Sequence, residues 1–258
     1  MSTIYTLNGK VLKNAANDKW LIKAVPVDPY NPLGLPPNTV RVRTSDGLVP
    51  TKAQFTSYET ATLVPGTTDV YDVYKSGTDF SSLLYQCSNV VEILGANTTG
   101  ITNMNSMFWS LKATSIPLFD TSSVTNMGSM FRSSHLISVP LFDTSSVTNM
   151  SYMFGTSTIT NVPLFDTSSV TNMEHAFDGC GSLTSIPLFN TSNVTKMGAT
   201  FYNCKIVQSG ALALYQQASS QATPPSQHGI TFANCGINTQ TGAAELAQIP
   251  SDWGGTAA

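Results

Sequence analysis

A near-identical segment recurs four times in the middle of the chain, and this repetition constrains the fold more than any other feature. The segments read IPLFDTSSVTNMGSMF, VPLFDTSSVTNMSYMF, VPLFDTSSVTNMEHAF and IPLFNTSNVTKMGATF, and they begin at Ile116, Val139, Val162 and Ile186. The period is therefore 23 residues, with a final step of 24. A unit of this size is too small to bury its own apolar face, so neighbouring units must stack.

Each repeat combines a short apolar run with polar turn chemistry. In the second repeat, residues 138–142 (SVPLF) are short and apolar, which favours a strand. Asp143, followed by Thr-Ser-Ser, favours a turn because its carboxylate can accept backbone amide hydrogens two residues on. Asn149 is placed to cap a short helical turn that follows it.

One face of that helical turn is apolar. Met150, Met153 and Phe154 follow the i, i+3, i+4 spacing that places side chains on one side of a helix. Stacking would align equivalent side chains of successive repeats as ladders in a core, rather than as a metal or cofactor site. The expected ladders are Val124, Val147, Val170 and Val194; Met127, Met150, Met173 and Met197; and Phe131, Phe154, Phe177 and Phe201.

The period predicts a repeat solenoid, leucine-rich-repeat-like, with short strands and short helical turns, because repeats of about 20 to 29 residues are typical of that class. An incomplete repeat from Ile101 and a degenerate one from Phe80 extend it, so we expect about five to six turns. The expected segments are an N-terminal β attachment segment with a Pro-rich linker at 1–37, a β-type N-terminal cap at 38–79, the solenoid at 80–207 and a helical C-terminal cap at 208–258.

The flanking segments carry their own local signals. Asn-Gly between two alternating runs predicts a hairpin over residues 4–12. Residues 40–44 and 61–74 are β-type sequence. The Ala-, Leu- and Gln-rich segment 210–221 and the segment 241–249 predict two helices, which would cover the open apolar end of the repeats.

The unit F-D-T-S-x-V-T-N-M-x-x-M-F resembles the BspA-like leucine-rich repeat of bacterial surface antigens and of mobile-element and phage proteins. The resemblance extends from about Phe80 to Cys204 and is specific because the motif recurs within one sequence. It implies a right-handed solenoid with a short strand per turn and an adhesive or recognition role. The family has no catalytic residues to transfer.

Composition and motifs exclude several other functions. Charged residues make up 10% of the chain and the net charge is −3, so neither nucleic acid nor anionic lipid is an expected partner. No apolar run reaches the roughly 18 residues of a membrane span, so no membrane insertion is expected. The histidines lack zinc spacing and the cysteines form no CxxC, so we expect no metal and no cofactor. Cys180 and Cys204 fall on adjacent repeats, which leaves a disulfide between them open.

A ladder of aspartates is the one pattern that suggests catalysis. Asp120, Asp143 and Asp166 occupy the same repeat position, so stacking would bring their carboxylates to about 4.8 Å. Retaining glycosidases place two carboxyls about 5 to 5.5 Å apart. An identical ladder, however, offers no difference between an acid and a nucleophile, and each aspartate has a turn role. We therefore predict that the protein is not an enzyme, and a calcium ladder is equally disfavoured.

Positions that differ between otherwise identical repeats are the candidate binding residues. Loops on a rigid scaffold commonly carry binding, and these positions vary while the frame is constant. The alternative is neutral drift at solvated positions. The predicted binding residues are Trp109, Arg132, His135, Tyr152, Glu174 and His175.

The sequence thus favours a non-enzymatic binding protein of a phage tail fibre or other virion appendage, which recognises a host-cell surface glycan or protein. No secretory signal is expected at the N-terminus, where neither a basic start nor an apolar segment stands. The N-terminal segment, with Trp20-Leu21-Ile22, is expected to contact other virion proteins or to form a homo-oligomer, a trimer by analogy with fibres. The alternatives are a bacterial adhesin at the cell surface and a tailspike-like polysaccharide depolymerase.

Overall fold

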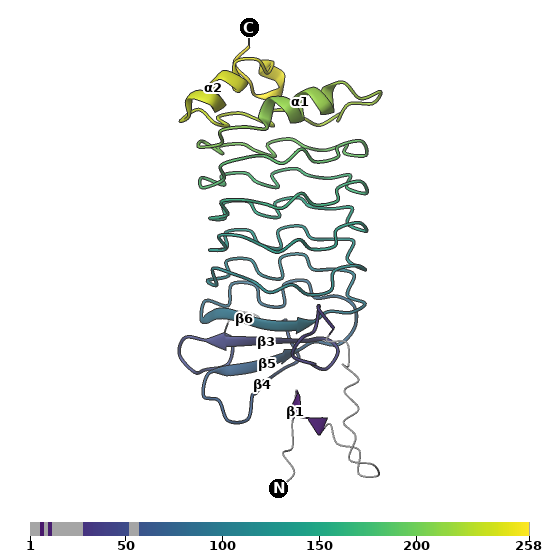
Figure 1. Cartoon of the computed structure of the whole chain (residues 1–258), viewed down its shortest axis with the longest axis vertical. Coiled ribbons are helices and arrows are strands. Elements are labelled where there is room, and N and C mark those ends of the chain that lie inside the picture. The colour runs from purple at the N-terminus through teal and green to yellow at the C-terminus, as the bar shows by residue number, and fades with distance from the viewer. Residues whose placement is uncertain (1–5, 8–9, 12–27, 52–56, 258) are drawn as a thin grey trace.

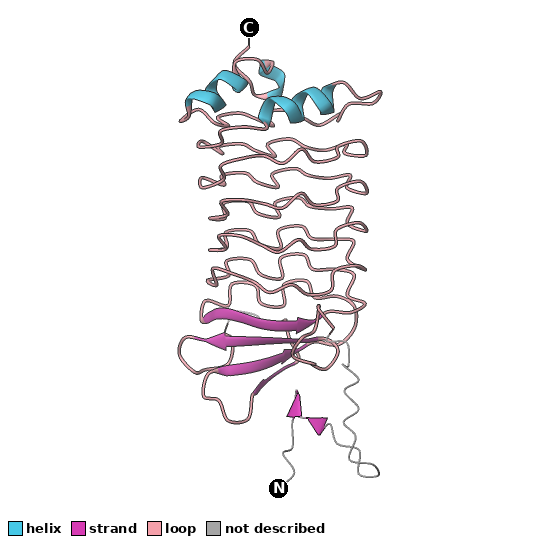
Figure 2. Cartoon of the chain, viewed as in Figure 1, coloured by secondary structure: helices cyan, strands magenta, loops and turns pink. Residues whose placement is uncertain are grey.

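The computed structural model describes residues 6–7, 10–11, 28–51 and 57–257 of the 258-residue chain. Its centre is a tall stack of coils, one coil per sequence repeat, with a small β-sheet at one end and helices at the other (Figure 1). Between β6 (Val90–Asn97) and α1 (Ala211–Ser219) the coils consist of turns and irregular backbone rather than of regular helices or strands (Figure 2). One period of the sequence repeat therefore makes one coil of the stack.

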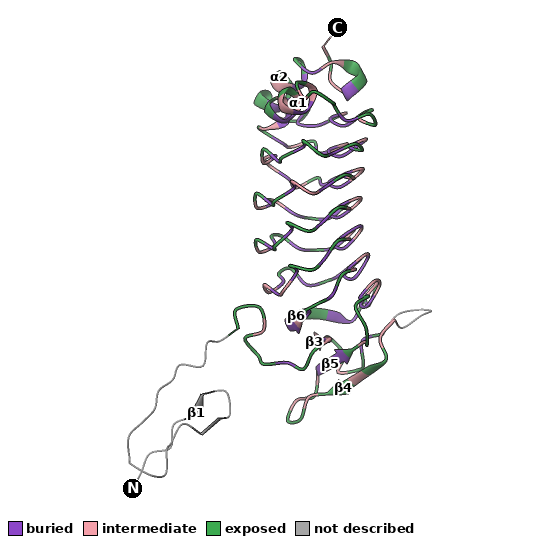
Figure 3. Ribbon diagram, turned by 90° about the vertical axis from the view of Figure 1, so that its right-hand side faces the viewer, coloured by how far each residue is buried: buried purple, intermediate pink, exposed green. Residues whose placement is uncertain are grey.

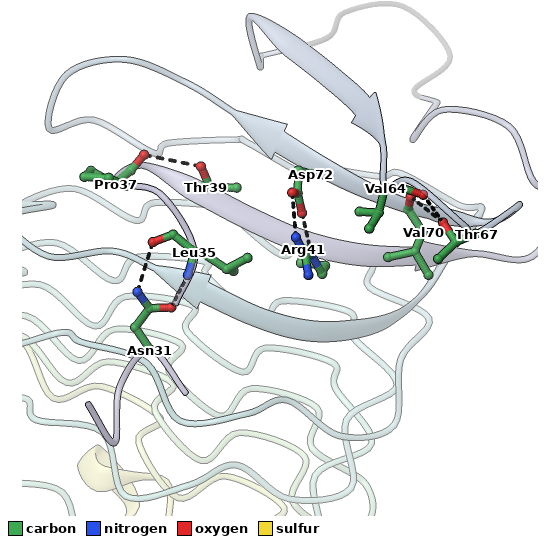
Figure 4. Close-up of polar contacts among 9 residues, drawn as sticks. All are labelled: Asn31, Leu35, Pro37, Thr39, Arg41, Val64, Thr67, Val70 and Asp72. Carbon is green, nitrogen blue, oxygen red and sulfur yellow. Dashed lines mark hydrogen bonds and ion pairs between the residues drawn. The ribbon is translucent and has the colours of Figure 1, made fainter. Parts of the chain in front are cut away.

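The sheet that closes the N-terminal end is antiparallel, in the order β4-β5-β3-β6. Val40 and Val42 point into the core and are fully buried, while Arg41 lies on the other face and forms an ion pair with Asp72, with Nε 2.6 Å from Oδ1 (Figure 4). This alternation is the expected pattern of a strand with one buried face. The strands are β3 (Thr39–Thr44), β4 (Thr60–Leu63), β5 (Val70–Tyr74) and β6 (Val90–Asn97).

Several local predictions in the flanks are confirmed. β1 (Thr6–Leu7) pairs with β2 (Lys10–Val11) as the expected hairpin, and β3, β4 and β5 fall in the segments expected to be β-type. Trp20-Leu21-Ile22 lies outside the described residues.

The end of the Pro-rich segment is bound to the sheet. Leu35 is buried, its amide donates to the side chain of Asn31, and its carbonyl accepts from Asn97 of β6 (Figure 4 shows the Asn31 contacts). The part of the expected linker from residue 28 onward is therefore held by side-chain hydrogen bonds.

Backbone hydrogen bonds hold each coil on the next. In the first of the four full repeats the amides of Met127, Ser129 and Phe131 donate to carbonyls 22 residues further on, at 2.9, 2.7 and 2.8 Å. The same alternation recurs in the following coils. Every second amide of this segment is thus satisfied by the neighbouring coil, which makes the stacking register a property of the main chain.

Threonine hydroxyls add a second set of bonds between coils. Thr144 is buried, and its hydroxyl donates to the carbonyl of Asp166 in the next coil at 2.8 Å. Thr121 and Thr167 do the same to their own neighbours. The polar T of the repeated DTSS motif is therefore an internal bonding group.

The predicted strand at residues 138–142 is wrong. These residues form no ladder, and the parallel bridges between coils lie instead at the asparagine position, from Asn126 to Asn149 to Asn172. Pro140 explains the difference because it has no amide hydrogen to donate. The amide of Phe142 bonds to the carbonyl of Pro140 at 3.0 Å, which closes a tight turn within the segment.

The predicted helical turn at Met150–Phe154 is also replaced. Tyr152 has φ of 55°, as do the equivalent Ser129 (55°) and His175 (56°), so the backbone alternates into the left-handed region instead of continuing as a helix. Left-handed residues redirect alternate amides toward the next coil. Backbone hydrogen bonds to the next coil therefore form in place of the local i to i+4 hydrogen bonds of a helix.

The core itself follows the prediction. All members of the expected Val, Met and Phe ladders are buried, and buried residues recur at the same place in each coil (Figure 3). Neighbouring rings of the Phe ladder stack, with centroids 5.5 Å apart for Phe131 and Phe154 and 5.4 Å for Phe154 and Phe177. The apolar positions of the repeat thus form one continuous column through the molecule.

The C-terminal end is closed by a further coil and by helices. Phe232 stacks on Phe201 at 5.9 Å and so continues the Phe ladder. Both predicted helices are present, and the carboxylate of Glu245 accepts from the amides of Gly210 and Leu212, which joins the start of α1 to α2. The elements are α1 (Ala211–Ser219), α2 (Gln240–Leu246) and the 3-10 turn η1 (Ser251–Trp253).

Candidate functional site

Four of the six predicted binding residues meet in one column on the surface of the stack. They come from two positions of the repeat. Trp109 and Arg132 directly follow the ladder phenylalanine of their coils, whereas Tyr152 and His175 stand two residues after the ladder methionine. All four are partly exposed. The side chains therefore extend from successive coils toward a common line on the surface.

The column is continuous through ring and cation–π contacts. The Trp109 and Tyr85 rings meet edge to face with centroids 5.1 Å apart. The Arg132 guanidinium carbon lies 4.6 Å from the centroid of the Trp109 ring and 4.5 Å from that of Tyr152. Tyr152 in turn stacks on His175 at 4.4 Å with the rings nearly parallel. We name Tyr85, Trp109, Arg132, Tyr152 and His175 the side-chain column.

Gly155 lets the column pass from one repeat position to the other. It occupies the place of Trp109 and Arg132 in its own coil but has no side chain. A Cβ built there would lie 3.6 Å from Cδ1 of Tyr152. The ring of Tyr152 therefore lies against the surface that a larger residue at 155 would occupy, and it reaches Arg132 of the preceding coil.

The ends of the column differ in charge. At one end the imidazole of His175 contacts a carboxylate, with Nδ1 2.9 Å from Oδ2 of Asp178. At the other end lies the phenol of Tyr85. Neither Tyr85 nor Asp178 was among the predicted binding residues, although both follow the ladder aromatic or its equivalent in their coils. That shared position was the signal that could have identified them.

The remaining two predicted residues lie outside the column. His135 is exposed and contacts Lys112 of the preceding coil, with Nε2 3.5 Å from Nζ. Glu174 takes part in stacking through its main chain, because its carbonyl accepts from the amide of Tyr152. Neither contact joins these two residues to the side chains of the column.

The aspartate ladder has the turn role expected of it. Oδ1 of Asp143 accepts from the amide and the hydroxyl of Ser145, at 3.1 and 2.7 Å, and Asp120 does the same with Ser122. Hydrogen bonds from Ser168 lower the pKa of Asp166. Within the described ranges, no group of three or more His, Cys, Asp and Glu side chains is arranged to hold a metal ion.

Cysteines lie inside the stack rather than in a reactive site. Cys180 and Cys204 are not bonded to one another, and each thiol donates to a main-chain carbonyl, of Phe154 and Phe177 respectively, at 3.1 Å. Burial raises the pKa of Cys180 to about 12 and raises that of Cys204 as well. A thiol in this environment stays protonated and is a poor nucleophile.

A second surface feature is a row of exposed leucines from the repeated PLF triplet. Leu141, Leu164 and Leu188 are 61%, 62% and 52% exposed, although the adjacent phenylalanines are buried. A shallow hollow of about 280 Å³ lies between two of these coils, lined by Leu164, Leu188 and their neighbours. Every residue of the triplet is apolar, so the residue pattern alone could not show which of them would be exposed.

Comparison with known proteins yields one family. A family described as "Mycoplasma protein of unknown function, DUF285" matches residues 78–164 and 135–219, which together span more than half of the chain. Neither the curated proteins nor the solved structures provide a match. In the portion of the chain that the structure describes, none of the helices has the length and apolar character needed to cross a bilayer. The match supports the resemblance to BspA-like repeats, and the chain belongs to this repeat family of unknown function.

Proposed function

We propose that the protein is a non-enzymatic binding protein, built on a leucine-rich-repeat-like solenoid, that recognises a receptor on a cell surface through the side-chain column. The observation that carries the proposal is that side chains from five successive coils, at positions that vary between the repeats, contact one another along one line of the surface. Aromatic and arginine side chains are the residues most often found at binding hot spots. The stack supplies the rigid support that such a surface needs.

The test is binding of the labelled full-length protein to a panel of bacterial cells, measured by flow cytometry. Alanine at Trp109, Arg132 and Tyr152 together is expected to abolish binding. A matched control replaces the exposed Ser123 and Ser138, which lie on the same stack, and is expected to bind as the wild type does. Unchanged binding by the triple variant would remove the column from the proposal.

We also propose that the aspartates of the ladder are not catalytic. Asp120, Asp143 and Asp166 each accept the amide of the serine two residues on, so every carboxyl of the ladder has a turn contact and none has the apolar surroundings that keep a catalytic acid protonated. Incubation with bacterial envelope polysaccharides is therefore expected to release no new reducing ends. If reducing ends appear and are lost in Asp143→Asn, the depolymerase alternative replaces the binding proposal.

We further propose that the protein is part of a virion appendage, with the surface of a bacterial cell as the alternative setting. Both settings use a repeat surface for recognition, and the BspA-like resemblance includes both. Mass spectrometry of purified phage particles and of washed cell envelopes from the producing strain separates them. Detection in particles supports the virion setting, and detection only in envelopes supports the adhesin.

A further inference from the structure

The central member of the side-chain column is an arginine held between two aromatic rings. The guanidinium of Arg132 lies 4.6 Å from the Trp109 ring centroid and 4.5 Å from the Tyr152 centroid, on rings that belong to the preceding and following coils. The N–H donors of a guanidinium lie in its own plane. With one ring from the preceding coil and one from the following coil beside it, the guanidinium can present its N–H donors to a ligand on the outer surface of the stack.

Arg132 differs from the arginines of the sheet in having no acidic partner. Arg41 is bonded to Asp72, and Arg43 to Asp69 and Glu92. Among the residues that the structure describes, no carboxylate lies within ion-pair distance of Arg132. Stacking thus restricts the side chain, and within the described residues no carboxylate neutralises its charge.

One further cation, Lys112, lies on the coil that precedes that of Arg132. His135 follows Arg132 by three residues and contacts Lys112, whose Nζ lies 3.5 Å from His135 Nε2. The carboxylate of the column, Asp178, is engaged with His175 at the far end. Arg132 and Lys112 thus lie on two adjacent coils of a protein whose net charge is −3.

We propose that Arg132 binds a carboxylate or sulfate group of an acidic glycan, an inference that rests on the proposed function and names its ligand class. A planar guanidinium matches the two oxygens of such a group with parallel hydrogen bonds. Trp109 and Tyr152 are both partly exposed beside the guanidinium, so they can contact the sugar that carries the acidic group. Nucleic acid fits less well, because its affinity depends on many phosphate contacts and this patch has few cations.

The experiment measures binding of the full-length protein to immobilised polysaccharides by biolayer interferometry. Dextran sulfate and dextran share one backbone and differ in charge, polygalacturonate supplies carboxylates, and poly-L-glutamate supplies carboxylates without sugar. We expect binding to dextran sulfate and polygalacturonate, and none to dextran. Arg132→Gln is expected to weaken the binding by about tenfold or more, which is the usual effect of losing a hydrogen-bonded charge.

Two further variants make the result specific. Arg132→Lys keeps the charge but loses the planar donors, so it is expected to recover only part of the affinity. Lys205→Gln removes an exposed charge elsewhere on the stack and is expected to leave affinity unchanged. Equal thermal unfolding midpoints for the variants establish that the fold is intact. If Arg132→Gln binds as the wild type does, or Lys205→Gln weakens binding equally, the proposal is overturned.

The remaining outcomes separate this inference from the proposed function. Equal, Arg132-dependent binding of poly-L-glutamate would overturn the glycan assignment in favour of an acidic peptide. Wild-type protein that binds cells but none of the acidic polysaccharides would overturn the inference and leave the proposed function standing. Protein that binds the acidic polysaccharides through Arg132 but binds no cells would support the inference and contradict the proposed function.

Discussion

Single apolar residues of the repeat are expected to differ sharply in their contribution to the free energy of unfolding. Phe154 is fully buried between Phe131 and Phe177, whereas Leu164 is 62% exposed. Phe154→Ala would leave a cavity in the column and is expected to lower the free energy of unfolding by about 3–5 kcal/mol. Leu164→Ala, as the control, is expected to change it by less than about 0.5 kcal/mol. Urea unfolding followed by circular dichroism measures both, and similar values would contradict the assigned register.

Cysteine reactivity provides a second measurement at the scale of residues. Burial raises the pKa of Cys180 and of Cys235 to about 12, so both thiols are protonated at neutral pH. The native protein is therefore expected to leave these two thiols unmodified by a thiol reagent at pH 8, and to release them after denaturation. Mass spectrometry of the modified peptides identifies the sites. Rapid labelling of Cys180 in the native protein would show that it is accessible.

The same burial makes stability depend on pH. Folding raises the pKa of Cys180 from its ordinary value of 9.0 to about 12. The stabilisation that comes from this raised pKa is therefore complete below pH 9 and is lost as the pH rises toward 12. In that range the unfolded chain releases the proton and the folded chain keeps it. The free energy of unfolding is expected to fall between pH 9 and 11. In Cys180→Ala the fall should be shallower, and identical slopes would exclude this thiol as the cause.

At the scale of elements, the coil depends on residues in the left-handed region that are not glycine. Ser129 has φ of 55°, and its amide reaches the carbonyl of Ser151 in the next coil. A β-branched residue is strained at this φ, so Ser129→Val is expected to cost about 1–2 kcal/mol. Ser129→Gly is expected to be nearly neutral, because relief of strain is offset by the entropy of glycine in the unfolded chain.

The matched control for this element is Ser138, which is exposed and lies outside the left-handed region. Ser138→Val is expected to change stability by less than about 0.5 kcal/mol. Thermal unfolding of the three variants measures the difference. If valine lowers the unfolding midpoint equally at 129 and 138, the coil does not depend on the left-handed backbone at position 129.

At the scale of the whole molecule, we predict a homo-oligomer, with a trimer favoured, formed through the N-terminal segment. The segment includes the apolar Trp20-Leu21-Ile22. Burial of a few hundred Å² of apolar surface, at about 25 cal/mol per Å², would stabilise the association of chains by several kcal/mol. Light scattering of the full chain is expected to give an oligomer. A chain that begins at Asp28, which keeps Leu35 in place on the sheet, is expected to be a monomer. An oligomer unchanged by this truncation would contradict the assignment.

The sequence alone determined the period, the buried positions and the residues that vary. Stacking at a fixed step follows from units too small to bury their own apolar face, so the Val, Met and Phe ladders could be assigned before the backbone was known. The turn role of Asp143, the hairpin and both C-terminal helices depend on local chemistry and were predicted correctly.

Only the tertiary structure decided the path of each coil and the composition of the site. Met150, Met153 and Phe154 have helical spacing, but bonds to the next coil, which lie 22 residues away in the sequence, selected left-handed turns instead. The side-chain column depends on the same step. Arg132 lies far from Trp109 and Tyr152 along the chain, and only stacking at one coil per repeat brings the three side chains into contact.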